Sequence, residues 1–163
     1  MSEQTQNQEL DFEFDLSSLP DLPEYIKWPA GSYDCEVVSL RGEVVSMGSN
    51  DTPCVVLKVK LLNVNEVKPI DAKVPEIGTE NTWNFPLTGR DDSEEAQERA
   101  LGSVKRMMMP FAQAFGTTNN KEIYAKAVGT KIKLITSVSV KKGDAKAGEE
   151  DKIYSNVKNI IVE

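Results

Sequence analysis

Lysine side chains recur at every second position in two segments of this chain that have the pattern of β-strands. Alternate residues of a strand point to the same side of a sheet, so each segment would carry a row of ammonium groups. Such rows could follow the phosphates of a nucleic acid, or they could keep exposed strands soluble and unpaired. No acidic residue interrupts residues 123–143, which favours binding. The lysines are Lys58 and Lys60 in the first segment and Lys131, Lys133, Lys141 and Lys142 in the second.

Aromatic residues in neighbouring segments could stack on unpaired bases. Trp83 and Phe85 lie two positions apart in one apolar segment, and Tyr33 and Tyr154 lie early in two others. Each stacked base contributes about 1–3 kcal/mol without reading the base sequence. The alternative is that the rings belong to the hydrophobic core, since Leu87 would share a face with Trp83 and Phe85. We take the four aromatic residues, with the lysines, as candidate nucleic-acid-binding residues.

Catalytic and metal-binding chemistry has few residues to use. The chain has 163 residues, no histidine and two cysteines, Cys35 and Cys54. This composition removes the commonest general base, imidazole-activated nucleophiles and four-thiolate metal sites. The acidic cluster at residues 91–95 precedes a predicted helix, whose positive N-terminal end explains it. We therefore expect no enzymatic activity, no catalytic residue, no metal and no cofactor.

The negative charge is concentrated at the N-terminus. The net charge is −7, and residues 1–24 contain seven acids and no basic residue. The rest of the chain is neutral on balance, and residues 99–143 hold nine basic residues against the single acid Glu122. The sequence thus predicts an acidic mobile arm over residues 1–24 and a binding domain over residues 25–163.

The arm has a pattern of its own. Phe12, Phe14 and Leu16 alternate with carboxylates. Such a segment could imitate nucleic acid in the protein's own basic groove, could bind another replication or recombination protein, or could be a solubilising tail. We take these three residues as candidate partner-binding residues.

Five strands and a helical region are predicted in the remainder. The helical region starts near Asp92, with Glu95 completing a capping box, and is kinked or ended at Pro110 or stopped at Gly116. Its predicted apolar stripe consists of Leu101, Val104, Met108, Phe111 and Phe115. A short second helical segment is predicted over residues 120–128. The strands are predicted over residues 32–41, 53–62, 80–87, 130–141 and 152–162.

This order indicates a mainly β fold: a five-stranded OB-fold-like barrel with a helix between strands 3 and 4. Other five-stranded α+β arrangements share the same order. The segments FDLSSLPDLPE, PAGSY, NTWNFPLTG, AVGTKIKL and YSNVKNI span most of residues 12–161. In these segments the chain resembles a family of small bacteriophage OB-fold single-stranded DNA-binding proteins. The resemblance implies replication or recombination work on unpaired DNA.

We therefore expect sequence-tolerant binding of single-stranded DNA in phage-type replication or recombination. The alternative is a protein-interaction or virion-assembly adaptor built on an OB-like barrel. The first residues lack the basic and apolar regions of a signal peptide, and no apolar run approaches the roughly 20 residues of a membrane span. We expect no membrane partner and a cytoplasmic location, in the host cytoplasm if a phage encodes the protein.

Overall fold

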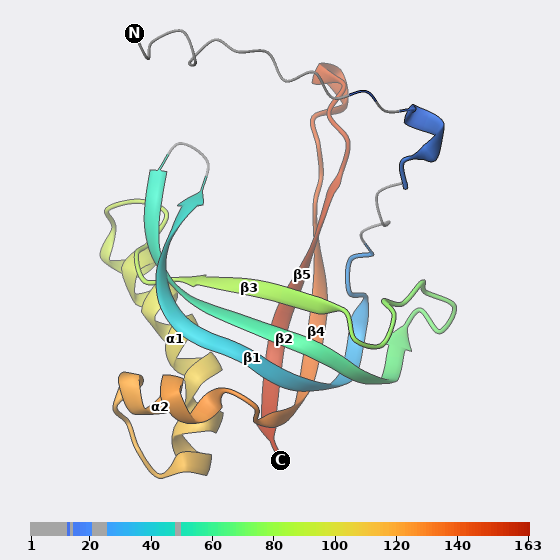
Figure 1. Ribbon diagram of the computed structural model, residues 1–163. Helices are drawn as coiled ribbons and strands as arrows, with labels where there is room; N and C mark the ends of the chain where they lie inside the picture. Colours follow the sequence, from blue (N-terminus) through green and yellow to red (C-terminus); the bar gives the residue numbers. More distant parts are fainter. Residues whose placement is uncertain (1–12, 14, 21–25, 48–49) are drawn as a thin grey trace, which may run out of the picture.

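A computed structural model of the chain describes residue 13, residues 15–20, residues 26–47 and residues 50–163. Figure 1 shows a strongly bent sheet with two helices at one side. Neither helix is long and apolar enough to cross a membrane, among the residues so described. The strands are β1 (Ala30–Met47), β2 (Asn50–Lys68), β3 (Glu80–Pro86), β4 (Lys131–Lys141) and β5 (Lys152–Val162), and the helices are α1 (Glu94–Phe115) and α2 (Asn120–Ala127).

All five strands join one antiparallel sheet in the order β3-β2-β1-β4-β5. The mainly β fold with five strands is therefore confirmed. Backbone pairing does not close the sheet into a barrel, because β3 and β5 remain its two edges. A side chain connects these edges: Nε1 of Trp83 on β3 donates a hydrogen bond to the carbonyl oxygen of Ser155 on β5, at 3.1 Å.

The first two strands are longer than predicted. Gly42 and the polar residues after it resemble a strand end, yet Gly42 pairs with Val55 within the ladder that joins β1 to β2. This hairpin and the β4–β5 hairpin both extend beyond the centre of the sheet, and they project to the same side (Figure 1). A short 3-10 turn, η3 (Ala145–Ala147), lies between β4 and β5.

Alternation along the strands places one set of side chains in the core. Tyr33, Cys35 and Val37 of β1 are buried, as are Ile132 and Leu134 of β4. The residues between them lie on the opposite side of the sheet, which we call the outer face. The core continues into β2 through Leu57, Val59 and Leu61.

Helix α1 closes the core with a stripe that differs from the predicted one. Val104 and Phe111 are buried as expected, but Met107 is buried with them and Leu101 is 47% exposed. The helix begins one residue later than the capping box suggested, since the Ser93 side chain accepts a hydrogen bond from the Ala96 amide. It also continues through Pro110 to Phe115 and ends at Gly116, whose φ is +68°.

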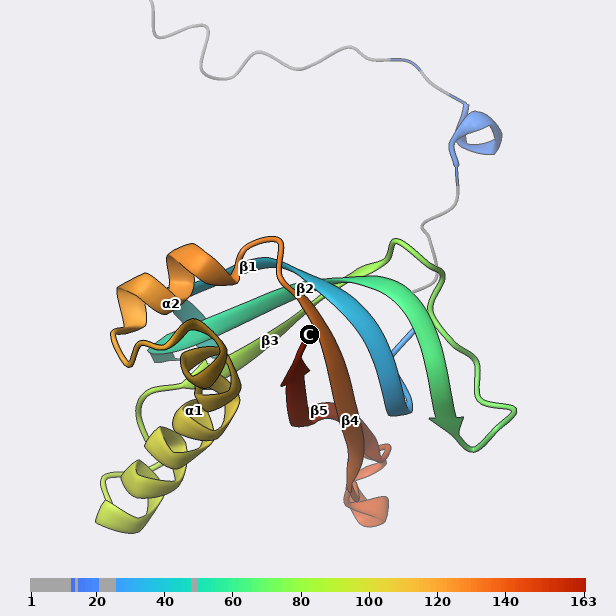
Figure 2. The same ribbon diagram turned by 90° about the horizontal axis from the view of Figure 1, so that it is seen from below.

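Two helices separate β3 from β4 along the chain, and the second, α2, nearly coincides with the helical segment predicted over residues 120–128. Helix α1 packs on β3 and β5, which are the two edges of the sheet, whereas α2 packs on β1. Figure 2 shows the bent sheet from below, with both helices beside it. The space between α1 and the edge strands is therefore where exposed side chains from three elements can meet.

Candidate nucleic-acid interface

The outer face of the sheet carries alternating charges rather than a row of cations. Lys60 on β2 lies opposite Glu80 on β3 and opposite Glu36 on β1. Glu36 in turn lies opposite Lys131 on β4. Four adjacent strands thus contribute acid, base, acid and base across one line of the sheet. Opposite charges on neighbouring strands attract one another. The carboxylates therefore lower the positive electrostatic potential that would attract a phosphate to this face.

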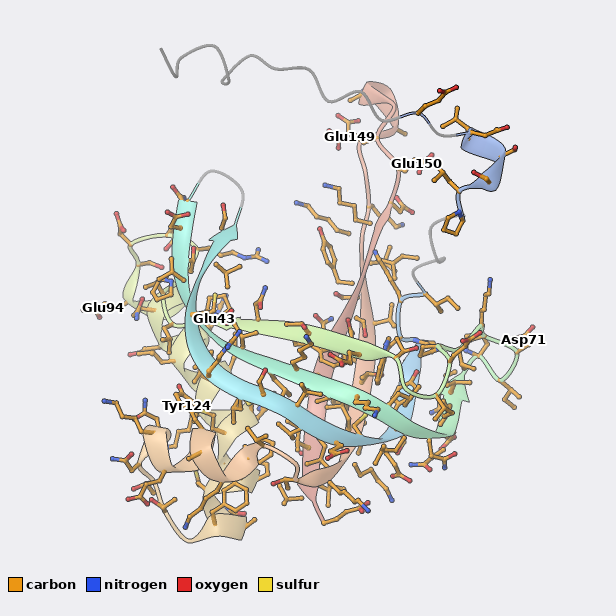
Figure 3. All side chains as sticks on the ribbon, viewed as in Figure 1. Glu43, Asp71, Glu94, Tyr124, Glu149 and Glu150 are labelled. Atoms are coloured by element: carbon orange, nitrogen blue, oxygen red, sulfur yellow. The ribbon has the colours of Figure 1, made fainter. Side chains whose placement is uncertain are left out.

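Two more of the predicted lysines, Lys58 and Lys133, also have acidic neighbours. Lys58 forms an ion pair with Glu80 at 3.0 Å, and Lys133 lies opposite Asp34. Lys141 lies opposite Lys152 of β5, and it lies with Lys142 at the end of the β4–β5 hairpin, where Figure 3 also shows Glu149 and Glu150. The sequence predicts two uninterrupted cationic rows. For Lys60, Lys131 and Lys133 the register of the sheet corrects this expectation, because β1 places its carboxylates between the lysines of β2 and β4. Lys141 and Lys142 lie beyond the part of β4 that pairs with β1, and their role stays a prediction.

Two of the predicted stacking residues belong to the core. Tyr33 is fully buried and its hydroxyl donates to the carbonyl oxygen of Pro29. Trp83 is 8% exposed and meets Trp28 edge-on, with ring centroids 5.5 Å apart. Neither ring has a free face for a base, so the core alternative is correct for both. Phe85 is half-buried and Tyr154 is 45% exposed, and these two remain candidates.

A groove of about 790 Å³ runs between α1, β3 and β5, and it brings together cations that the sequence pattern did not single out. We call it the cationic groove. Phe85 and Tyr154 line it, and Trp83 contributes to its wall. Asp91 is the acidic residue among the lining residues that the structure describes. The basic residues along the groove are Arg90, Arg99, Arg106 and Lys158.

Helix α1 provides one wall through residues three or four positions apart. Arg99, Ser103 and Arg106 all line the groove, as expected for positions that share a helix face. Ala96 and Ala100 line the same wall. These small side chains leave width for a ligand beside the longer side chains of Arg99 and Arg106.

The loop from β3 to α1 is fixed against the helix and carries Arg90. The Gln97 side chain accepts a hydrogen bond from the Gly89 amide at 3.0 Å and donates one to the carbonyl oxygen of Leu87 at 2.9 Å. A Cβ on Gly89 would come within 2.6 Å of the Ala96 backbone, so this close approach requires glycine. Hydrogen bonds from Ser93 hold the pKa of Asp91 below its usual range, which keeps this carboxylate charged beside the arginines.

Strand β5 provides the opposite wall, and an irregularity in it presents Lys158. Ile135 of β4 pairs with Asn159, but the next residue, Thr136, pairs with Val157. Lys158 therefore has no opposite residue in β4. Such bulges redirect the side chain of the extra residue, and here Lys158 is exposed and lines the groove.

The two cysteines are buried thiols. Burial raises the pKa of the Cys35 thiol to about 12, and it raises the pKa of Cys54 as well. A thiol that stays protonated at neutral pH is a poor nucleophile and a poor metal ligand. Both residues are thus core residues in the structure.

The predicted partner-binding residues of the arm are described only in part. Phe12 and Phe14 lie outside the described residues. Leu16 begins the short 3-10 turn η2 (Leu16–Ser18), which Asp15 caps, and it is 78% exposed. No protein-family model and no curated protein matches this chain, so the family resemblance remains a prediction.

Proposed function

We propose that this protein binds single-stranded DNA without sequence preference, and that the strand lies in the cationic groove. The observation that carries the proposal is the composition of the groove wall, where the described lining residues include four cations, one carboxylate and two partly accessible aromatic rings. Proteins that bind single strands combine a positive groove with aromatic side chains on which bases stack. The outer face of the sheet, with its alternating charges, offers neither feature.

Binding would begin with electrostatic attraction. Arg99 and Arg106 on α1 and Lys158 on β5 face the groove from its two sides, so a backbone between them would meet cations on both. Arginine can also donate two parallel hydrogen bonds to one phosphate, which fixes the position of the strand. Counterions released from the DNA would then make the affinity fall as salt rises.

Base stacking would follow on Phe85 and Tyr154. Their rings are partly accessible at the groove, and unpaired bases can reach them whereas paired bases cannot. The amide side chains of Asn84, Asn156 and Asn159 also line the groove and can hydrogen-bond to bases or phosphates of any sequence. The expected preference is therefore for single strands over duplex DNA.

The fold and the sequence resemblance support the same proposal. A five-stranded sheet that is bent until a side chain of β3 bonds to β5 is compatible with an OB-fold, which is a five-stranded, partly open barrel. OB-folds commonly bind oligonucleotides. Together with the resemblance to phage proteins, this favours a role in DNA replication or recombination in the cytoplasm, without catalysis and without a cofactor.

A protein-interaction role has one specific observation in its favour. The part of the β4–β5 hairpin that does not pair with β1 exposes apolar side chains. Val140 is 56% exposed and Ile153 is 47% exposed. Leu16 in the arm is exposed as well. Apolar side chains of this kind suit contact with a replication or assembly protein. This role would make the protein an adaptor, and it would leave the affinity for DNA negligible.

Fluorescence anisotropy with labelled oligothymidylate distinguishes the two functions. We expect binding that is tighter for oligothymidylate than for a duplex of the same length. The logarithm of the affinity should fall with the logarithm of salt concentration, with a slope of about −0.7 per neutralised phosphate. Binding that ignores salt, or that favours the duplex, would rule out the proposed function. An RNA oligomer in the same series measures the preference between the two nucleic acids.

A further inference from the structure

A second cavity, of about 580 Å³, lies between the N-terminal end of the described domain and the β4–β5 hairpin. We call it the Trp28 pocket. Trp28, Pro29 and Pro69 form part of its wall, and Val138 and Ile153 come from the hairpin. Its size falls within the range of about 300–1,000 Å³ that is usual for sites that bind small molecules.

Two of the residues that line this pocket, Trp28 and Ser155, each have a buried polar atom with unused hydrogen-bonding capacity. Trp28 is 1% exposed, and among the described residues neither its Nε1 nor the Oγ of Ser155 has a hydrogen-bond partner. A buried polar group without a partner costs about 1–3 kcal/mol, so a ligand that satisfies it gains affinity. Nε1 is a donor, whereas a hydroxyl both donates and accepts. A ligand for this pocket therefore needs an acceptor and at least one further polar group on an otherwise apolar body.

The pocket and the cationic groove share Tyr154, which lines both. The ammonium group of Lys27 lies over the Tyr154 ring, 5.9 Å from its centroid, and also donates to the carbonyl oxygen of Ile153. Tyr154 thus lies at the boundary of the two cavities, with the Lys27 ammonium group over its ring. A nucleic acid strand that leaves the groove over Tyr154 would reach the pocket next.

The charges at the pocket suit a polyanion. Lys27, Lys68 and Lys152 line it, against the single acid Asp151 among the described lining residues. The three ammonium groups can contact phosphates on either side of a base that enters the pocket, since they are exposed. The pocket is also more apolar than the groove, with prolines and aliphatic side chains that suit the faces of a planar ring.

We propose that the Trp28 pocket accepts one nucleobase of the strand that the cationic groove holds. The base would place a ring nitrogen or carbonyl oxygen toward Nε1 of Trp28 and a second polar group toward Oγ of Ser155. This proposal rests on the proposed single-stranded DNA binding. It adds a subsite that holds one base by its polar edge, and because every base carries a ring nitrogen or carbonyl oxygen that can accept, the subsite adds affinity without requiring a particular sequence.

The test uses the full chain with either Val138 or Val140 replaced by tryptophan. Val138→Trp fills the pocket, while Val140→Trp adds the same bulk two residues along the same face of β4 and outside the pocket. Each protein is titrated with oligothymidylate of about 12 nucleotides, within the range that one small domain covers, and with an abasic oligomer of the same length. Thermal unfolding shows which variants are folded.

We expect Val138→Trp to weaken binding of oligothymidylate on the order of tenfold, the effect of losing one bound base. Its affinity for the abasic oligomer should not change, and Val140→Trp should alter neither affinity. If Val138→Trp and the unmodified protein bind oligothymidylate equally well, the pocket holds no base, although the proposed function would stand. If the unmodified protein does not bind oligothymidylate, the proposed function fails and the subsite fails with it.

Photocrosslinking of the unmodified protein provides a second measurement that needs no variant. An oligomer containing 5-iododeoxyuridine should crosslink to residues 27–29, to residues 151–153 or to Ser155, as mapped by mass spectrometry. Crosslinks confined to the walls of the cationic groove outside these ranges would overturn the subsite while supporting the groove.

Discussion

The indole nitrogen of Trp83 donates to the carbonyl oxygen of Ser155, at 3.1 Å, and so joins the two edge strands of the sheet. No backbone pairing connects β3 and β5 among the described residues, which makes this bond the direct polar link between the edges. Both strands line the cationic groove. The width of the groove therefore depends on a side chain that the sequence marks only as an aromatic residue in a strand.

Replacing Trp83 by phenylalanine should lower the free energy of unfolding by about 1 kcal/mol for the lost hydrogen bond, besides the loss of ring area. Trp28→Phe is the matched control, because it removes an indole whose Nε1 has no partner among the described residues. Urea denaturation measures the free energy of unfolding of both variants. An equal loss of stability in the two variants would show that the bond between β3 and β5 contributes nothing.

Alkaline pH should lower the free energy of unfolding, because the buried Cys35 thiol and Tyr33 phenol resist ionisation in the folded state. Burial raises the pKa of Cys35 from 9.0 to about 12 and that of Tyr33 from 10.0 to about 12. Above about pH 9 the unfolded chain begins to lose these protons while the folded chain keeps them, so the unfolded state binds fewer protons. The free energy of unfolding should be fully retained below pH 9 and should fall as the pH rises toward 12.

Urea denaturation at about pH 8 and about pH 10.5 checks this sign for the unmodified protein and for Tyr33→Phe. The variant should lose less stability between the two pH values, because it has no phenol to ionise, even if it is less stable at both. A loss as large as that of the unmodified protein would mean that Tyr33 is not the group that titrates.

The acidic arm should compete with DNA. Deletion of residues 1–24 removes seven acids, and the affinity for oligothymidylate should rise, most clearly at low salt where charge repulsion is least screened. A variant with the same acids changed to their amides should bind as tightly as the deletion. Unchanged or weaker binding by the deletion variant would show that the arm does not occupy or repel the ligand site, and would favour recruitment of a partner protein.

The strands were predicted well because apolar and polar residues alternate within each strand, and this pattern can be read from neighbouring positions in the sequence. Residues 152–162 and residues 80–87 coincide with β5 and nearly with β3. The lengths of β1 and β2 were missed because Gly42 and its polar neighbours resemble a turn. In the fold, cross-strand pairing continues through them, and such pairing outweighs local preference.

The site was harder to predict because charge balance on a sheet depends on register. Nothing near Lys60 in the sequence indicates that Glu36 and Glu80 lie beside it. Arg99 and Arg106 could have been found, since residues seven apart share a face of a predicted helix. Lys158 could not, because its exposure at the groove depends on a strand irregularity that shows only in the pairing of β4 with β5.

The most direct measurement compares two double variants that lose the same charge. Arg99→Gln with Arg106→Gln removes two cations from the groove, and Lys60→Gln with Lys133→Gln removes two from the outer face. Affinity for oligothymidylate is measured over a series of salt concentrations. The groove variant should bind at least about tenfold more weakly, and its log–log salt slope should be shallower by about 1.4, because two phosphates are no longer neutralised. The outer-face variant should stay within about twofold of the unmodified protein. An equal or larger loss in the outer-face variant would contradict the assignment of the strand to the cationic groove.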